Sequence, residues 1–581
     1  MHVVATAGHV DHGKSTLVRA LTGMEPDRWA QERSRGMTID LGFAWTTLPS
    51  GAVVAFVDVP GHERFVPNML AGVGPVPAAL VVVAADEGWM PQSEEHLAAL
   101  DALGVRHGLL AITRTDLAPP SAAAALARAR LGETSLGAVE CVAVCGPTGV
   151  GLDELRAALD RLVARLPVPD PEAPVRLWVD RSFTIRGAGT VVTGTLGAGT
   201  VRAGDELELA GTGRRLRVRS VQALGAPTEQ VTAVARVGLN LRGVDRDQVR
   251  RGDALLTPHR FQVTDLIDVR LSEQARPGTL TLHIGSAAVG VRVRPLGTDT
   301  ARLRLDRPLP LRIGDRALLR DPGRHRIAAG VTVLDVVPPA LRRRGAAAAR
   351  AAALSSLDGR PDERVELHRR GLARQGDLER MGVTVHGAPV AGDWHADPGY
   401  WQGLRARLAE EATRYAAAHP LAPEPPVEVL RQALDLPDRA LVDALRGRHG
   451  GPTAVPGLPE PVAAAVARVR AQLDDRPFAA PDAQTLARLG LGHRELAAAV
   501  RAGALLRVAA GIVLLPDAAG EAVRVLAALP QPFTLSQARQ ALGTSRRVAV
   551  PLLELLDRQG ATRRLSDDRR TVVPGSSDRD G

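Results

Sequence analysis

The first part of the chain alternates short apolar runs with stretches of helical spacing. HVVATA at the N-terminus and AALVVVAA further along are strand-sized, while STLVRALTG places its apolar residues at helical intervals. Strands that alternate with helices are typical of α/β domains. The pattern therefore predicts an α/β domain over residues 1–170.

The pattern changes at about Arg176, where helical spacing gives way to short alternating segments broken by glycine. RLWVDRSFTIRGAGTVVTGTLGAGTVRAGDELELA shows this change most clearly. Evenly spaced short strands with turns between them indicate small β-barrels. We expect one barrel over residues 174–258 and a second over residues 259–338, where another run of strands extends from Phe261 to about Val337.

Helices return after residue 338, behind the linker PPALRRRGAAAARAAAL. The segment that begins with PFTLSQARQALGTS has the pattern of a helix, a turn, a longer helix and two short strands, which is typical of a winged helix-turn-helix. The same plan recurs from PFAAPDAQTLARLG, more weakly from Leu421, and faintly over Gly359 to Asp397. Residues 339–581 are thus predicted to hold about four tandem winged-helix modules, the last at about 530–575.

The composition is that of an ordinary globular protein, with 45% apolar and 24% charged residues. The longest apolar run is strand-sized and the N-terminus lacks a targeting pattern, so we expect a cytoplasmic protein without a membrane segment. A net charge of +9 permits a polyanionic partner such as RNA. Cys141 and Cys145 form neither a disulfide framework nor a complete zinc site. Nothing in the sequence requires more than a monomer.

The segment GHVDHGKS, Gly8 to Ser15, lies between the first predicted strand and the first predicted helix. It fits G-x-x-x-x-G-K-[ST], the pattern of a loop whose backbone N–H groups surround nucleotide phosphates. Lys14 is the only lysine among 73 lysine and arginine residues. A compact ammonium reaches the β- and γ-phosphates where a planar guanidinium fits poorly, and Ser15 is placed to coordinate Mg²⁺.

Two further segments have the order of a nucleotide switch. ERSRGMTID offers Thr38, whose oxygens can close on Mg²⁺ and the γ-phosphate and move away once that phosphate is lost. In VAFVDVPGHERF, Asp58 ends an apolar strand and can hold Mg²⁺ through water. His62 follows Gly61 and can orient an attacking water, because phosphoryl transfer depends mainly on positioning and charge stabilisation.

A later strand, LLAITRTD, predicts the base-recognition site. The strand ends at Thr113-Arg114-Thr115-Asp116, and Asp116 can accept two hydrogen bonds from the ring N–H and amino group of guanine, a donor pair that adenine lacks. Arg114 can lay its stem along the base. The segment CGPTG, which begins with Cys145 and Gly146, can supply a backbone N–H to the guanine oxygen. Together these segments favour GTP over ATP.

GHVDHGKST, RGMTIDLGF, DVPGHERFVPNMLAGV and TRTD resemble segments of translational elongation factors, and among these most closely the selenocysteine-specific elongation factors. The resemblance implies a GTPase that binds GTP, GDP and Mg²⁺, with His62 as the catalytic histidine and Thr38 and Asp58 completing the metal site. It also implies that the phosphates are bound by Asp11, His12, Gly13, Lys14, Ser15, Thr16 and Gly61. Arg114 stands where the family has lysine, and Cys145-Gly146 stands where it usually has Ser-Ala.

The resemblance extends to the barrels and the C-terminal modules. It implies an aminoacyl pocket on the first barrel, which we assign to Asp180, Arg181 and Arg236, because a basic pocket attracts an ionised selenol and leaves neutral serine behind. It further implies an mRNA hairpin on the last module, whose candidate contacts are Arg546, Arg547, Arg563 and Arg564.

The expected function is GTP-dependent delivery of selenocysteinyl-tRNA to the ribosome at UGA codons, with the C-terminal arm on a hairpin in selenoprotein mRNA. Two alternatives stay open. A general elongation or initiation factor has the first three domains but leaves the winged modules unexplained. An RNA-binding regulator whose conformation is controlled by GTP accounts for the modules but delivers no aminoacyl-tRNA.

Overall fold

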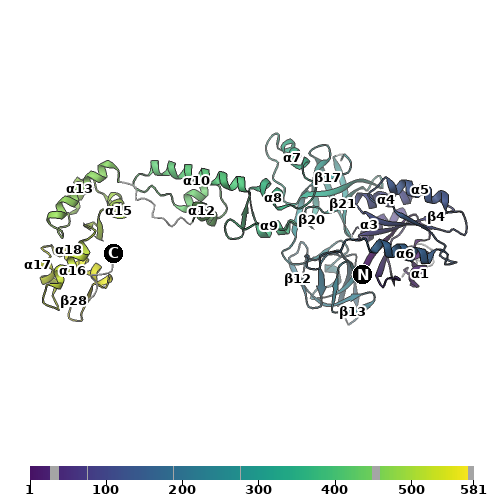
Figure 1. Cartoon of the computed structure of the whole chain (residues 1–581), viewed down its shortest axis with the longest axis horizontal. Coiled ribbons are helices and arrows are strands. Elements are labelled where there is room, and N and C mark those ends of the chain that lie inside the picture. The colour runs from purple at the N-terminus through teal and green to yellow at the C-terminus, as the bar shows by residue number, and fades with distance from the viewer. Residues whose placement is uncertain are drawn as a thin grey trace. The chain divides into compact units, whose positions relative to one another are not determined.

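The computed structural model describes residues 1–26, 38, 40–74, 76–187, 189–274, 277–447 and 458–573 (Figure 1). The chain divides into two compact units, Met1–Ala388 and Pro389–Gly581. The predicted end of the last module at about 575 lies outside the described residues. Across the described ranges, no helix combines the length and apolar character that crossing a bilayer requires.

The first domain is a six-stranded sheet with helices on both faces. The strands have the order β2-β3-β1-β4-β5-β6, and all neighbours are parallel except β2 with β3. Helices α3, α4 and α5 pack on one face, while α1 and α6 pack on the other. The elements are β1 (His2–Ala7), α1 (Lys14–Thr22), β2 (Gly42–Thr47), β3 (Val53–Asp58), α3 (Val66–Val73), β4 (Ala78–Ala84), α4 (Pro91–Ala102), β5 (His107–Thr113), α5 (Ser121–Gly132), β6 (Glu140–Ala143) and α6 (Leu152–Val163).

The apolar runs in the sequence become the central strands of this sheet. Every residue of β4 is buried, as expected for a strand covered by helices on both faces. In a parallel sheet, the loops after the strands collect at one edge, and ligands bind there where the strand order reverses. The loops after β1, β3, β4 and β5 therefore meet at the same edge.

Two barrels follow the α/β domain. In the first, β11-β16-β7-β9-β15-β12 form a ring that the pairing of β11 with β12 closes. Its core consists mainly of valine and leucine from alternate strand positions. The strands are β7 (Arg176–Trp178), β8 (Arg181–Ile185), β9 (Gly189–Leu196), β10 (Thr200–Arg202), β11 (Glu206–Leu209), β12 (Arg214–Ala223), β13 (Ala226–Thr228), β14 (Gln230–Thr232), β15 (Ala235–Arg242) and β16 (Ala254–Leu256).

The second barrel is closed in the order β17-β20-β19-β18-β21-β22. Leu318 of this barrel joins the apolar core of the α/β domain, and Arg320 forms an ion pair of 3.5 Å with Glu95 on α4, so the barrel packs against that helix. The strands are β17 (Gln262–Leu271), β18 (Gly278–Ile284), β19 (Ala287–Pro295), β20 (Thr300–Leu311), β21 (Arg316–Asp321) and β22 (Arg326–Asp335).

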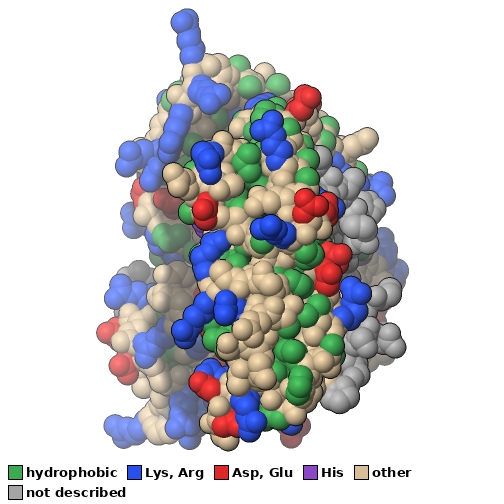
Figure 2. Space-filling model, turned by 90° about the vertical axis from the view of Figure 1, so that its left-hand side faces the viewer, with side chains coloured by type: hydrophobic (Ala, Val, Ile, Leu, Met, Phe, Trp, Pro, Cys, Tyr) green, Lys and Arg blue, Asp and Glu red, His purple; other side chains and the backbone are tan. Residues whose placement is uncertain are grey.

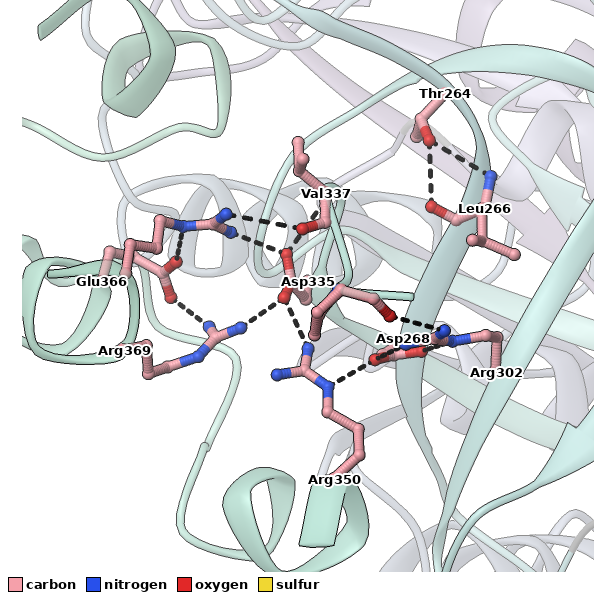
Figure 3. Close-up of polar contacts among 11 residues, drawn as sticks. Thr264, Leu266, Asp268, Arg302, Asp335, Val337, Arg350, Glu366 and Arg369 are labelled. Atoms are coloured by element: carbon pink, nitrogen blue, oxygen red, sulfur yellow. Dashed lines mark hydrogen bonds and ion pairs between the residues drawn. The ribbon is translucent and has the colours of Figure 1, made fainter. Parts of the chain in front are cut away.

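A buried ionic cluster joins the second barrel to the helices that follow it (Figure 3). Asp335 at the end of β22 accepts hydrogen bonds from Arg350, Arg369 and Arg370. Asp268 on β17 is fully buried and binds Arg302 and Arg350 at 2.7 Å. The cluster fixes α7 (Ala346–Ser355) and α8 (Glu363–Arg370) on the barrel, and β23 (Leu372–Arg374) and α9 (Gln375–Arg380) follow.

The second unit begins with β24 (Trp394–Ala396), α10 (Pro398–Ala418), α11 (Val427–Ala433) and α12 (Arg439–Arg446). Two winged-helix arrangements follow α13 (Glu460–Asp475) and share one apolar core. One has α14 (Ala483–Arg488), α15 (His493–Arg501), β25 (Leu506–Ala509) and β26 (Ile512–Leu514). After α16 (Ala518–Ala527), the other has α17 (Leu535–Ala541), α18 (Arg546–Arg558), β27 (Thr562–Arg564) and β28 (Arg570–Val572).

A capping box starts α17, because Thr534 and Gln537 exchange side-chain and backbone hydrogen bonds there. The fold class predicted from the sequence is confirmed: an α/β domain, two barrels, and winged helices at the C-terminus.

Candidate functional site

The glycine-rich loop lies between β1 and α1 at the edge where the parallel strands end. Lys14 is 6% exposed, and its ammonium donates to the carbonyls of Gly8 at 3.0 Å and His9 at 2.7 Å. Gly13 has φ +79°, a left-handed conformation that glycine adopts without strain. The loop thus has the shape that lets backbone N–H groups converge on an anion at the start of α1.

Three oxygen-bearing side chains meet beside Lys14. The Ser15 hydroxyl donates to Asp58 Oδ2 at 2.7 Å and lies 2.9 Å from Thr38 Oγ1. Asp58 is fully buried, and its other oxygen accepts from Thr6 at 2.7 Å. The structure therefore brings together the three residues that the sequence assigns to the metal site.

The loop after β3 closely approaches the glycine-rich loop. A Cβ atom on Gly61 would lie 2.5 Å from both Lys14 Nζ and the Val10 nitrogen, so only glycine fits there. His62 follows directly, and its Nδ1 accepts a hydrogen bond from the Arg64 N–H at 3.2 Å. A neutral imidazole that accepts at Nδ1 carries its hydrogen at Nε2.

The loop also contains a buried histidine. The ring of His12 is fully buried, and burial is the main cause that lowers its pKa to about 4, although the contact with the Val82 carbonyl opposes this shift. The neutral ring donates from Nδ1 to that carbonyl at 3.3 Å. His12 therefore acts on the loop through its backbone and its packing.

The residues assigned to guanine recognition lie at the ends of β5 and β6. Thr113 is buried and donates to the His12 carbonyl at 2.7 Å, which joins the end of β5 to the glycine-rich loop. Asp116 is exposed just beyond it. A Cβ atom on Gly146 would lie 3.4 Å from the Thr16 side chain, so the loop after β6 approaches the start of α1. Cys145 is buried in that loop.

Helix α4 supplies two contacts to the glycine-rich loop that sequence reasoning missed. The Gly8 N–H donates to His96 Nδ1 at 3.0 Å, and the Val10 N–H donates to Gln92 Oε1 at 3.1 Å. Complete burial lowers the pKa of His96 to about 3, so its ring stays neutral and accepts. The helical spacing of Gln92 and His96 was the available signal, since residues four apart share one helix face.

A cavity of about 880 Å³ lies where the first barrel faces the residues after Thr38. Arg181 donates to Asp40 at 3.1 Å across this boundary. Sequence reasoning assigned Asp180 and Arg181, which line the cavity, but missed most of its charged residues. The charged lining consists of Asp40, Asp180, Arg181, Arg246, Asp247, Arg250 and Arg251, so positive charges exceed negative charges by one.

Arg236, the third residue assigned to this pocket, does not line the cavity but binds Asp180, which does. Its guanidinium binds Asp180, with one bond of 2.6 Å, and lies 3.8 Å from the centre of the Phe43 ring. Arg236 thus fixes the orientation of Asp180 and packs the first barrel against β2.

The four candidate arginines of the last module differ in their contacts. All are exposed. Arg547 donates to the backbone carbonyl of Ala480 at 2.8 Å, and Arg564 forms an ion pair with Asp568. Arg546 lies at the start of α18 and Arg563 lies on β27. On the face drawn in Figure 2, basic side chains are spread widely with fewer acidic ones between them.

Family models match four stretches of the chain. They describe the elongation factor Tu GTP binding domain at residues 1–165, elongation factor Tu domain 2 at residues 189–256, the selenocysteine-specific elongation factor β-barrel domain at residues 265–340, and the elongation factor SelB winged helix at residues 524–571.

Known proteins match the chain over nearly its whole length. The selenocysteine-specific elongation factor of Escherichia coli (strain K12) is 34% identical over 97% of this chain and 98% of its own length. The crystal structure of bacterial selenocysteine-specific elongation factor EF-Sec covers 99% of this chain and all of its own, with a TM-score of 0.76 at 25% identity.

A shorter match is to SelB from Methanococcus maripaludis in complex with the GTP analogue GPPNHP. It covers 58% of this chain and 79% of its own, with a TM-score of 0.52 at 26% identity. The similarity to the E. coli protein thus includes the α/β domain, both barrels and the winged-helix end. This chain therefore belongs to the selenocysteine-specific elongation factors (SelB), and it is a translational GTPase that binds GTP and GDP.

Proposed function

We propose that this GTPase carries selenocysteinyl-tRNA to the ribosome at in-frame UGA codons while its C-terminal arm holds a hairpin in selenoprotein mRNA. A SelB winged helix lies in the same chain as an elongation-factor GTPase domain, and this combination supports the role. The first supplies an RNA-binding end and the second supplies a nucleotide-controlled carrier.

Ser15, Thr38 and Asp58 fit a bound Mg²⁺. Their hydroxyl and carboxylate oxygens lie 2.7 to 2.9 Å apart, and Mg²⁺ prefers hard oxygen ligands. Mg²⁺ bound there would neutralise charge on the phosphates of GTP. The γ-phosphate would keep Thr38 in this position, and its loss would release Thr38 and the residues that follow it.

His62 would orient the attacking water. Because Nδ1 accepts from the Arg64 N–H, the hydrogen on Nε2 is available to donate to the water oxygen. Positioning of this kind raises the rate without a covalent step on the protein. The ribosome would bring His62 into place, so hydrolysis would be slow before the ribosome is reached.

The cavity beside Asp180 and Arg181 would hold the aminoacyl group. A selenol ionises far more readily than a serine hydroxyl, and the excess of arginine in the lining favours an anion. Arg236 would act indirectly by fixing Asp180. Selenocysteine would thus be chosen over serine through charge.

Arg546, Arg547, Arg563 and Arg564 would contact the mRNA hairpin. Arginine side chains at the start of a helix and on a wing can meet phosphates and splayed bases of an RNA loop. Arg547 and Arg564 already bind groups of the protein. We therefore expect Arg546 and Arg563 to contribute more to the affinity for the hairpin.

Translation of a UGA-containing message in a reconstituted system tests the proposal. We expect selenocysteine insertion that requires this protein, GTP and a hairpin downstream of the codon. Insertion that does not depend on the hairpin would favour a general carrier. Binding to the hairpin without any insertion would favour the RNA-binding regulator.

A further inference from the structure

Arg114 holds together three parts of the nucleotide site. It directly follows β5 and has φ +54°, a left-handed conformation that is uncommon outside glycine. Its Nη2 donates to the backbone carbonyl of Asp11 in the glycine-rich loop. The arginine therefore spans from the guanine-recognition strand to the phosphate-binding loop.

Two carboxylates hold the other side of the same guanidinium. Nη1 donates to Glu87 Oε1 at 2.7 Å and to Asp86 Oδ2 at 3.1 Å. Both acids follow β4, which pairs with β1 and β5 in the sheet. The side chains of Arg114, Asp86 and Glu87 are 28% to 35% exposed, so the ion pairs lie at the surface of the site and are only partly screened by water.

The geometry of this contact requires a guanidinium. Two separate nitrogens are used, one for the carboxylates and one for the Asp11 carbonyl, and a planar guanidinium presents both in fixed directions. A lysine ammonium has one nitrogen and cannot occupy both positions. The two acids and the arginine therefore form a matched set in this chain.

The contacted part of the loop needs support. Asp11 has φ +64°, so it sits in a conformation that costs free energy for a residue with a side chain. The end of β5 binds two neighbouring carbonyls of the loop. Arg114 donates to the carbonyl of Asp11, and Thr113 donates to the carbonyl of His12. Loss of the first contact would leave the turn at Asp11 less restrained.

We propose that Asp86 and Glu87 are positioning residues of the nucleotide site, which orient Arg114 so that it ties the glycine-rich loop to the guanine-recognition strand and thereby slows nucleotide release. Neither acid is placed against the nucleotide. Both act through Arg114, which in turn sets the position of Asp11 and of Asp116 two residues further along. Glu87 Oε2 also lies 3.5 Å from His12 Nε2 in the glycine-rich loop, so Asp86 gives the cleaner test.

The test is the rate at which fluorescently labelled GDP leaves the full-length protein after a chase with unlabelled GDP. We expect Asp86→Asn and Glu87→Gln each to raise this rate about two- to fivefold, the range that partly exposed ion pairs support. Glu140→Gln is the matched control. Glu140 is 33% exposed and binds Arg161, as the other acids bind Arg114, but it is the first residue of β6, whereas the nucleotide site lies beyond the last residue of that strand. The control should release GDP at the wild-type rate.

A double-mutant cycle separates this role from a general loss of stability. In an Arg114→Met background, Asp86→Asn should have no further effect on release, because the partner that Asp86 orients is gone. Any effect that Glu87→Gln keeps there measures its separate contact with His12. High salt should accelerate release from the wild type by a larger factor than from the Asp86→Asn/Glu87→Gln protein, because salt screens the phosphates in both proteins but the ion pairs with Arg114 only in the wild type.

Arg114→Lys is the second variant, for use if Arg114→Met does not fold. It keeps the positive charge but has one nitrogen, so it should release GDP faster than the wild type. Wild-type release rates in the carboxylate variants would overturn the proposal. So would an acceleration by Asp86→Asn that persists undiminished in the Arg114→Met background.

Discussion

Arg181 Nε donates to Asp40 Oδ2 at 3.1 Å, and this ion pair joins the first barrel to the GTPase domain two residues after Thr38. Arg251 lies 3.6 Å from the other Asp40 oxygen and donates to Asn68 on α3 at 2.9 Å. One carboxylate thus contacts two arginines of the proposed cargo cavity. Movement of Thr38 with the γ-phosphate would be transmitted to that cavity through Asp40.

Asp40→Asn should therefore weaken the link between nucleotide and cargo. We expect the ratio of the affinities for selenocysteinyl-tRNA in the GTP-bound and GDP-bound states to fall about three- to tenfold, since the two partly exposed ion pairs that couple the cavity to the GTPase domain are lost. Asp247→Asn is the control, because Asp247 lines the same cavity from the barrel. An unchanged ratio in Asp40→Asn would refute the link.

His62→Ala tests the proposed positioning of water. Among the residues that the structure describes, the His62 side chain hydrogen-bonds within its own loop, to the Arg64 N–H, so its removal should leave the affinity for GTP nearly intact. Ribosome-stimulated hydrolysis should fall by about two to four powers of ten, the range typical of a lost positioning or acid–base group. A large loss of GTP affinity, measured by equilibrium binding, would contradict the assigned role.

Asp335→Asn should loosen α7 and α8 from the second barrel. Asp335 is about 1% exposed, and removal of one partner from a buried ionic cluster costs about 3 kcal/mol or more. Hydrogen exchange at neutral pH should become faster in these two helices. Asp358→Asn, in the exposed loop between them, should leave exchange unchanged. Equal protection in wild type and Asp335→Asn would show that the cluster does not hold the helices.

The same cluster predicts how this attachment depends on pH. Burial alone would raise the pKa of Asp335, but Arg370 and Arg369 outweigh it and hold the pKa below its usual value. A carboxyl group whose pKa is lower in the folded than in the unfolded state stabilises the folded state. This stabilisation is complete above the pKa of the unfolded state, about 3.9, and it is lost as the pH falls through the pKa of the folded state. Protease resistance of the α7–α8 segment should therefore be constant from neutral pH down to about 4 and fall only below it.

Arg563→Ala should weaken binding of the mRNA hairpin without loss of fold, because Arg563 is exposed on β27. If Arg563 contacts a phosphate, the slope of log affinity against log salt should fall by about one. Arg405→Ala, on the exposed side of α10, is the matched control. Arg570→Ala should instead destabilise the module, because Arg570 is buried and binds Asp557 at 2.9 Å. Unaltered RNA affinity in Arg563→Ala would remove this residue from the interface.

The fold and the centre of the nucleotide site were predictable from the sequence because their signals are local. Apolar runs end at Asp58 and Thr113, and parallel strands bring such ends to one edge of a sheet. The glycine-rich segment then places Lys14 and Ser15 at the same edge. The convergence of Ser15, Thr38 and Asp58 follows from this arrangement.

The contacts that hold these parts together were not predictable in the same way. Asp40 and Arg181 meet only because two domains pack, and in a chain so rich in arginine no single arginine stands out from the sequence. The location of Asp86 and Glu87 at the nucleotide edge of the sheet was predictable, since they come just after the buried run of β4 and Asp58 comes at the end of β3. Their partner became evident only from the geometry around Arg114.

Cargo selection by the cavity is measured as the rate of ester hydrolysis of selenocysteinyl-tRNA and of seryl-tRNA on the same tRNA body, with the purified protein and a nonhydrolysable GTP analogue. We expect the selenocysteinyl ester to be protected and the seryl ester not, because the arginine-lined cavity would hold an ionised selenol. Equal protection of both esters, or protection of neither, would contradict this selection.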